Sequence, residues 1–219
     1  MDGILVVNKP AGFTSHDVVN VIRKKFNMKR VGHTGTLDPM ATGVLVILIG
    51  KATKLSATFV CDDKEYIARL FLGRATDTQD STGIITEEKY LGHLDIDSVR
   101  RVLNSFTGDM VQVPPLVSAK KFRGKPLYYF ARKGKSAPRT PCKIKIHGIE
   151  FIGFNKPEIT FRVKCSKGTY VRTLCEDIGR SLGYPAHMSM LVRIKSGKFS
   201  LEEAQDLERV TETNVQKLN

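Results

Sequence analysis

Apolar residues recur along the chain with two different periods, and each period predicts one kind of element. Short apolar runs and strict alternation predict strands, at residues 4–7, 44–49, 66–72, 144–146, 159–165 and 191–194. Apolar positions three and four residues apart predict helices, at residues 15–27, 97–107, 127–133, 170–182 and 200–207. Strands and helices follow one another without regular alternation. This order favours an α+β fold with a mixed, largely antiparallel central sheet flanked by helices.

Capping residues indicate where several of these helices should begin. Ser15 and Asp97 stand at two expected N-termini, and Ser200 with Glu203 has the spacing of a capping box for the last helix. The segment 32–43, in contrast, is too rich in glycine, threonine and proline to predict regular structure. We therefore expect a loop there, followed by a buried strand.

The chain of 219 residues has the composition of a globular protein, with 41% hydrophobic and 26% charged residues. This length suits one sizeable core, so we expect a single domain over residues 1–219. The longest apolar run, 44–49, is far shorter than the roughly 20 residues that a membrane-spanning helix needs. The N-terminus lacks the pattern of a signal peptide. We expect a cytoplasmic protein with no membrane partner, acting as a monomer.

The cysteines are scattered along the chain and show no metal-binding spacing. They form no CxxC pair and no cluster with histidine of the kind that binds zinc. We interpret them as small hydrophobic residues of the interior and expect neither a disulfide nor a metal. They are Cys61, Cys142, Cys165 and Cys175.

Positive charge dominates the chain and is concentrated in one stretch. The net charge is +13, and residues 110–149 contain no Asp or Glu. Four aromatic residues, Phe122, Tyr128, Tyr129 and Phe130, are interleaved with ten basic ones, among them Lys121 and Arg132. A one-sign stretch with aromatic side chains suits a phosphate backbone and unstacked bases. The charge therefore predicts a nucleic-acid partner.

The loop GHTGTLDPMATG, residues 32–43, surrounds a single carboxylate, Asp38, with glycines and threonines. Pro39 restricts Asp38 to an extended conformation. An Asp before proline is often only part of an Asx-turn, which is the structural alternative. Two features favour a catalytic role: His33 lies five residues earlier, and a buried strand follows directly. Rigid strands commonly position functional loops in this way.

Six segments together resemble the TruB family of bacterial tRNA pseudouridine synthases. GHTGTLDPMATGVL resembles the catalytic motif of that family. The other five occur in the family's order, so that the resemblance spans residues 3–200. They are VNKPAGFTSHDVV, KEYIARLFLGRATDTQDSTG, QVPPLVSAKKFRGKPLYYFAR, CSKGTYVRTLCEDIG and HMSMLVRIKSGKF.

The resemblance implies a pseudouridine synthase catalytic fold and an isomerisation that needs no cofactor and no metal. The N1–C1′ bond of a uridine in the tRNA T-loop, at position 55, would break, and C5 would bond to C1′. Asp38 matches the family's catalytic aspartate. Whether it attacks C1′, attacks C6 or removes a proton from C2′ stays open, since it would act as a nucleophile in the first two cases and as a base in the third.

Supporting roles follow from the same resemblance. Tyr66 matches the active-site tyrosine expected to stack on the uracil, and Arg172 matches the arginine expected to pair with Asp38. His33 resembles the histidine that fills the gap left by the flipped base. Substrate-facing positions are matched by Asp80, Lys167, Tyr170 and Leu191. Lys9, in the NKPAG segment, resembles a residue with a structural role.

The basic stretch at about 110–149 matches a thumb-like insertion that folds over the T stem-loop, with Lys121 and Arg132 as candidate contacts. Two departures from the family stand out. The chain has no segment matching a C-terminal PUA domain, and Lys120 occupies a position where an apolar residue is expected.

Three alternative functions remain open at this point. A relative directed by guide RNA shares the Asp loop, a tRNA-folding chaperone needs binding without catalysis, and a structural RNA-binding protein accounts for the charge alone.

Overall fold

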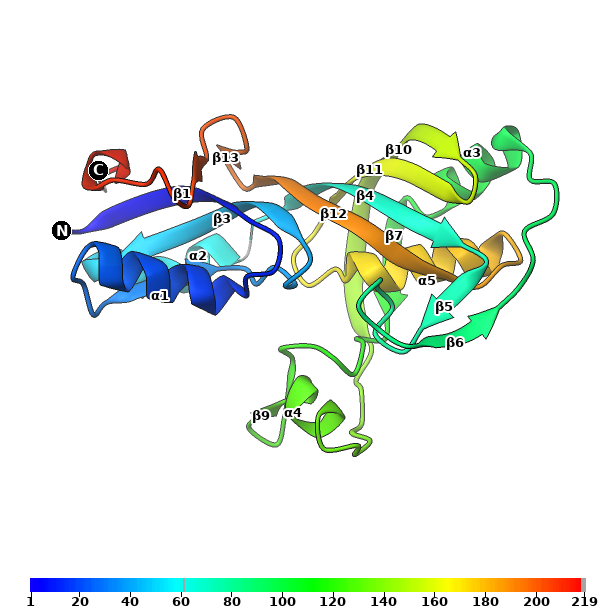
Figure 1. The fold of residues 1–219 in the computed structure, drawn as a ribbon, viewed down its shortest axis with the longest axis horizontal. Helices are drawn as coiled ribbons and strands as arrows, with labels where there is room; N and C mark the ends of the chain where they lie inside the picture. The colour runs from blue at the N-terminus through cyan, green and yellow to red at the C-terminus, as the bar shows by residue number, and fades with distance from the viewer. Residues whose placement is uncertain (61, 218–219) are drawn as a thin grey trace. The chain divides into compact units, whose positions relative to one another are not determined.

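A computed structural model describes residues 1–60 and 62–217. Backbone contacts divide it into two compact units, one of Met1–Tyr66 with Leu191–Asn219 and the other of Ile67–Met190. Each unit combines strands with helices (Figure 1). The α+β prediction is therefore confirmed. None of the helices in the described residues is long and apolar enough to cross a membrane.

The first unit is built on a mixed sheet whose central strands are β1 and β3. These two pair antiparallel over their whole length, from Gly3 opposite Ile49 to Lys9 opposite Gly43. Strand β2 pairs antiparallel with β3, whereas β14 pairs parallel with β1 and the end of β12 pairs parallel with β3. The elements are β1 (Gly3–Lys9), α1 (Ser15–Lys25), β2 (Val31–Thr34), β3 (Thr42–Ile49), η1 (Gly50–Leu55), α2 (Ser56–Val60), β12 (Ala186–Ser196), β13 (Phe199–Ser200), β14 (Gln205–Asp206) and η2 (Glu212–Asn214).

Hydrophobic cores cover both faces of this sheet. On one face Val18, Val19 and Ile22 of α1 pack against alternate residues of β1 and β3, including Leu5 and Ile47. On the other face the intervening residues of β1 and β3 pack against the segment after β12. A strand that is buried on both faces needs apolar residues at every position. This accounts for the uninterrupted apolar run that predicted β3.

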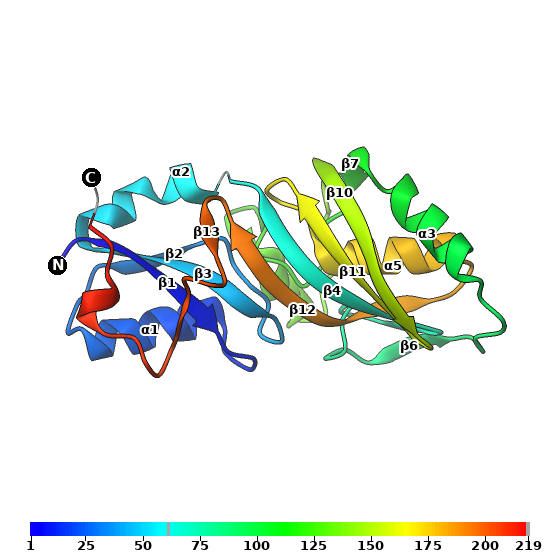
Figure 2. The same ribbon diagram turned by 90° about the horizontal axis from the view of Figure 1, so that it is seen from above.

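The second unit orders its strands β12-β4-β11-β10-β7. Helices α3 and α5 lie on one face of these strands (Figure 2), and the buried residues of α5 include Leu174, Cys175 and Ile178. Strands β4 and β12 have residues in both units. The elements are β4 (Lys64–Leu72), β5 (Arg74–Thr76), β6 (Ile85–Glu88), α3 (Ile96–Ser105), β7 (Gly108–Gln112), β8 (Lys121–Phe122), β9 (Lys125–Pro126), α4 (Leu127–Ala131), β10 (Cys142–Asn155), β11 (Glu158–Cys165) and α5 (Val171–Ser181).

The basic stretch leaves the sheet over a shorter range than the sequence suggested. Its first residues belong to β7 and its last to β10, and these strands pair with Gln112 opposite Cys142. Only residues 113–141 lie outside this ladder, and we call them the thumb. In Figure 1 the thumb projects from the sheet of its unit and carries α4 and β9.

The local signals misplaced two helix starts. Thr14, not Ser15, is the N-cap of α1, and it forms a capping box with Asp17. Asp95, not Asp97, is the N-cap of α3, where its carboxylate accepts from the backbone N–H of Ser98. Both errors are one or two residues long, because neighbouring polar residues can serve equally well as caps.

Two further predictions were wrong. Residues 32–34, expected in a loop, extend β2 along β3. The last expected helix, 200–207, is absent: the segment forms β13, a turn and β14. Glu203 does accept from the backbone N–H of Ser200, as in a capping box. Pairing of β14 with β1 replaces the helix, so a long-range ladder overrides the local signal.

Candidate active site

The Asp38 loop follows β2 in the first unit, and side chains from three other elements hold it. Asp38 itself is half-buried. Just before it, the hydroxyl of Ser15 accepts from the backbone N–H of Leu37 at 2.9 Å and donates to the Leu37 carbonyl at 3.2 Å. Ser15 is buried at the start of α1. One side chain thus satisfies both backbone groups of the residue that precedes the carboxylate.

Lys9, at the end of β1, holds the far side of the loop. Its side chain is fully buried, and Nζ donates to the carbonyls of Pro10 at 2.8 Å, Phe13 at 2.6 Å and Pro39 at 3.2 Å. Burial lowers the pKa of Lys9 to about 8, while the charge of Asp38 acts in the opposite direction. Lys9 therefore lies within electrostatic reach of Asp38 and is tied to the residue after it.

Arg193, on β12, joins the two ends of the loop. Its guanidinium is buried and donates from Nε to the carbonyl of Val44 at 2.7 Å and from a terminal nitrogen to that of Gly35 at 3.0 Å. β12 approaches so closely that a Cβ at Gly43 would lie 2.3 Å from the Arg193 carbonyl oxygen. Glycine there, with φ of 101°, permits the contact.

Three other predicted site residues also belong to the first unit. His33 lies on β2, where burial first, and then the charge of Arg193, lower its pKa. Its Nδ1 is buried and has no hydrogen-bond partner among the described residues. Tyr66 on β4 shares the buried face of that strand with Ala68, and Leu191 on β12 is buried. The lowered pKa of His33 favours its neutral imidazole.

Arg172 and Asp80 face one another in the second unit. Both side chains are about 5% exposed, and a nitrogen of Arg172 lies 3.8 Å from a carboxylate oxygen of Asp80. Arg172, on α5, also donates to the carbonyl of Val117 at 2.8 Å. Asp80 accepts from the hydroxyls of Thr78 and Thr82 and from the backbone of Thr82. Arg172 thereby connects the Asp80 turn to the start of the thumb.

The predicted pairing of Arg172 with Asp38 joins residues of different units and stays a prediction. Tyr170 and Lys167 precede α5. The side chain of Gln112, at the end of β7, accepts from the backbone N–H of Tyr170 and donates to its carbonyl, at 3.0 and 3.2 Å. Lys167 is exposed. Both residues thus lie on a segment that is fixed to the strand from which the thumb departs.

The thumb exposes its cations beside aromatic rings. The guanidinium of Arg132 lies 5.4 Å from the ring centre of Tyr128, and the ammonium groups of Lys125 and Lys133 lie 4.7 and 4.6 Å from that of Tyr129. Lys121 and Arg132 are both exposed. Exposed cations beside aromatic faces suit an RNA strand with unstacked bases.

Lys120, the unexpected charge in SAKK, has a structural partner. It donates to the carbonyl of Thr140 and to Sγ of Cys142, and so closes the base of the thumb. Cys165 and Cys175 are buried as predicted, whereas Cys142 is only half-buried. Cys61 lies outside the described residues.

Comparison with protein-family models shows to which family the chain belongs. Residues 23–171 match the model described as the TruB family pseudouridylate synthase N-terminal domain. Residues 172–218 match the tRNA pseudouridylate synthase B C-terminal domain. The chain belongs to the TruB family. The pseudouridine synthase fold expected from the motifs is thereby confirmed.

Curated members of the TruB family match over nearly the whole chain. The tRNA pseudouridine synthase B of Syntrophotalea carbinolica is 49% identical over 96% of this chain and 69% of its own length. That of Clostridium tetani is 47% identical over 99% of this chain and 75% of its own. That of Opitutus terrae is 45% identical over 96% and 87%.

Solved structures show the same fold. A Cbf5-Nop10-Gar1 complex matches with a TM-score of 0.75 and 33% identity, over 94% of this chain and 52% of that chain. An H/ACA RNP bound to a substrate RNA containing 2′-deoxyuridine matches with a TM-score of 0.70 and 30% identity, over 94% and 51%. The chain spans about half the length of these two proteins.

Two residues that hold the Asp38 loop were not predicted from the sequence. Ser15 was assigned only as a helix cap, and Arg193 was not singled out within HMSMLVRIKSGKF. Their acceptors lie 22, 149 and 158 residues away. An available signal was the charge of Arg193 itself, since an arginine within a buried strand must have polar partners.

Proposed function

We propose that this chain converts a uridine of the tRNA T-loop, at position 55, to pseudouridine, with Asp38 as the catalytic carboxylate. The observation that carries the proposal is the anchoring of the Asp38 loop by Ser15, Lys9 and Arg193. Catalysis requires a reacting group held in a near-attack position. A merely structural Asx-turn would not need three buried side chains from three elements.

The reaction is an isomerisation in which atoms balance without a co-reactant. The N1–C1′ bond breaks, the uracil turns, C5 bonds to C1′, and the proton lost from C5 is balanced by one gained at N1. Asp38 begins the reaction as an anion, either as nucleophile or as base. The nearby ammonium of Lys9 favours the charged form of a carboxylate.

The other site residues take supporting roles. Tyr66 would stack on the uracil and help to remove the C5 proton, beside the apolar side chain of Leu191. Arg172 would pair with Asp38, on a helix that Asp80 and Val117 hold in place. A base inside an RNA stack must be extruded before it can react, at a cost of a few kcal/mol. The neutral ring of His33 is suited to fill the gap.

The tRNA substrate is supported by the relatives and by charge. Identity is 45–49% to the three curated tRNA pseudouridine synthases B named above and 30–33% to the two H/ACA structures, which favours action on tRNA over guidance by a second RNA. The thumb and the segment of Lys167 and Tyr170 would bind the T stem-loop. We take the enzyme to act as a cytoplasmic monomer with one catalytic domain.

Incubation with an unmodified tRNA transcript tests the proposal. Carbodiimide-based mapping should reveal one new pseudouridine at position 55 with the wild type. Asp38→Asn, which keeps the side-chain shape, should lower kcat by roughly 10³-fold or more, because the essential carboxylate is gone. The variant should still bind tRNA with wild-type affinity.

Two other outcomes would contradict the proposal. Product at another position would refute the T-loop assignment. Salt-sensitive binding without product from the wild type would favour a tRNA-folding chaperone, whose function Asp38→Asn should leave intact.

A further inference from the structure

The second unit carries a basic surface that the catalytic proposal does not use. It is formed by three exposed lysines on β10 and β11, Lys143, Lys145 and Lys164, which we call the lysine face. None of the three ammonium groups makes an ion pair within the described part of the chain. Ile144 and Ile146, which alternate with two of them, are buried.

The register of the two strands puts the three lysines on one side of the sheet. Ile146 lies opposite Cys165, and both are buried, so their neighbours Lys145 and Lys164 point to the other side. Lys143 and Lys145 are two residues apart on one strand and therefore about 7 Å apart. Lys164 is the diagonal neighbour of Lys145, at roughly 7–8 Å.

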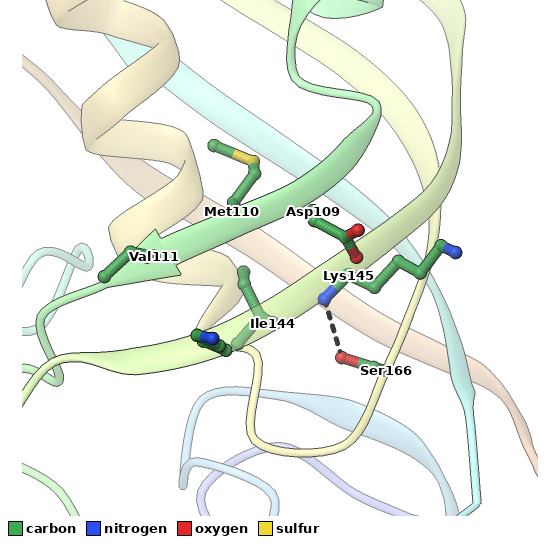
Figure 3. Close-up of a pocket in the computed structure, with 7 residues that line it drawn as sticks. Asp109, Met110, Val111, Ile144, Lys145 and Ser166 are labelled. Atoms are coloured by element: carbon green, nitrogen blue, oxygen red, sulfur yellow. Dashed lines mark hydrogen bonds between the residues drawn. The ribbon is translucent and has the colours of Figure 1, made fainter.

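A hollow lies beside these lysines at the β7–β10 ladder (Figure 3). Its volume is about 540 Å³, and its lining includes Lys143, Lys145 and Ser166. Asp109, opposite Lys145 in the ladder, is the acidic residue of the lining and offsets part of the charge. The rest of the lining consists of Met110, Val111 and Ile144, so two lysines stand beside apolar residues of two paired extended strands. This geometry suits a polyanion that runs along the strands.

We propose that the lysine face binds the phosphate backbone of the substrate tRNA outside the T stem-loop, an inference that rests on the proposed function. Charge complementarity supports it, since three exposed lysines that form no ion pair among the described residues can each contact a phosphate.

Chain continuity supports the same occupant. β10 begins at Cys142, directly after the thumb. On the side of β11, the backbone N–H of Lys145 donates to the Ser166 hydroxyl at 2.9 Å (Figure 3). The backbone N–H of Ser166 donates to the Lys145 carbonyl at 2.8 Å. Lys167 follows immediately. The lysine face therefore adjoins two segments already assigned to RNA, which favours RNA over an acidic protein.

The test compares two triple variants that remove the same charge. Lys143→Gln/Lys145→Gln/Lys164→Gln eliminates the lysine face. Lys24→Gln/Lys29→Gln/Lys54→Gln removes three exposed lysines of the first unit and is the matched control. Affinities for full-length tRNA and for an isolated T stem-loop hairpin are measured between 50 and 200 mM salt.

The lysine-face variant should bind full-length tRNA about tenfold more weakly at low salt, and the slope of log K against log salt should fall by about 2. Its affinity for the hairpin and its kcat at saturating tRNA should match those of the control variant. Thermal unfolding should be unchanged, because all three side chains are exposed.

Three results would overturn the inference. One is that the lysine-face variant binds tRNA as tightly as the control variant does, and another is that it loses as much affinity for the hairpin as for full-length tRNA. Loss of binding to poly-glutamate with tRNA affinity intact would instead indicate an acidic protein partner. The proposed function fails separately: it is refuted if the wild type makes no pseudouridine, whatever the binding results.

Discussion

Lys9 and Arg193 of the first unit carry the same charge as Lys121 and Arg132 of the thumb, in opposite surroundings. The first two are at most 1% exposed and bind backbone carbonyls of the Asp38 loop. The thumb pair is exposed, and Arg132 lies over the ring of Tyr128. A buried cation is costly unless every donor finds an acceptor, so its position is fixed. An exposed cation is solvated and remains available to a partner.

This contrast separates two functions of positive charge that the net charge of the chain cannot distinguish. Buried cations of this chain should control geometry and rate, with little influence on RNA affinity. Exposed cations should control affinity and its dependence on salt, with little influence on folding or rate. Three predictions test the division, beginning with the largest expected effect.

Replacing Arg193 should affect both stability and rate. Arg193→Met leaves the buried carbonyl of Val44 without this donor, at about 1–3 kcal/mol, and removes a second, half-buried bond to the carbonyl of Gly35. Misplacement of the loop should lower kcat by roughly 10²-fold, with KM for tRNA little changed. Urea unfolding and steady-state kinetics measure the two effects.

Arg193→Lys and Arg101→Met complete that test. Lysine keeps the charge but lacks the fork that reaches two carbonyls, so it should restore only part of kcat. Arg101 is exposed on α3, and its replacement should be silent. Wild-type kcat in Arg193→Met would refute a positioning role.

Lys9 should give stability a distinctive pH dependence. Its pKa is lowered from 10.5 to about 8 by burial. Between these values the unfolded chain binds a proton that the folded protein has released, so the wild type gains stability as pH rises. Relative to Lys9→Met, this gain should approach about 3 kcal/mol between pH 8 and 10.5.

The measurement is the difference in unfolding free energy between wild type and Lys9→Met across that pH range. Other titrating groups are common to both proteins and cancel. A difference that stays constant with pH would show that the Lys9 pKa is not lowered by folding.

The thumb cations should give the smallest effect, confined to binding. Lys121→Gln/Arg132→Gln should lower the slope of log K against log salt by about 1–2 and weaken tRNA binding several-fold. Unfolding free energy and kcat at saturating tRNA should be unchanged. Lys24→Gln/Lys29→Gln is the control. A fall in kcat at saturating tRNA would contradict the claim that exposed cations affect only binding.

Local patterns along the sequence determined a good part of this protein. Alternation predicted a strand at residues 66–72, which lies within β4, and the apolar run 44–49 predicted a buried strand, which is β3. The motifs indicated the TruB family and Asp38. Side-chain periodicity and motif spacing are local properties, so a short stretch of sequence is enough to recognise them.

Only the tertiary structure decided what holds Asp38 and what became of residues 200–207. Ser15 serves Leu37 and not a helix cap, and Arg193 spans the loop from β12. The acceptors are backbone carbonyls, which every residue possesses, so sequence gives no sign of which will be chosen. Likewise, β14 forms because β1 offers a free edge in space, a long-range pairing that the capping signal of Ser200 and Glu203 could not anticipate.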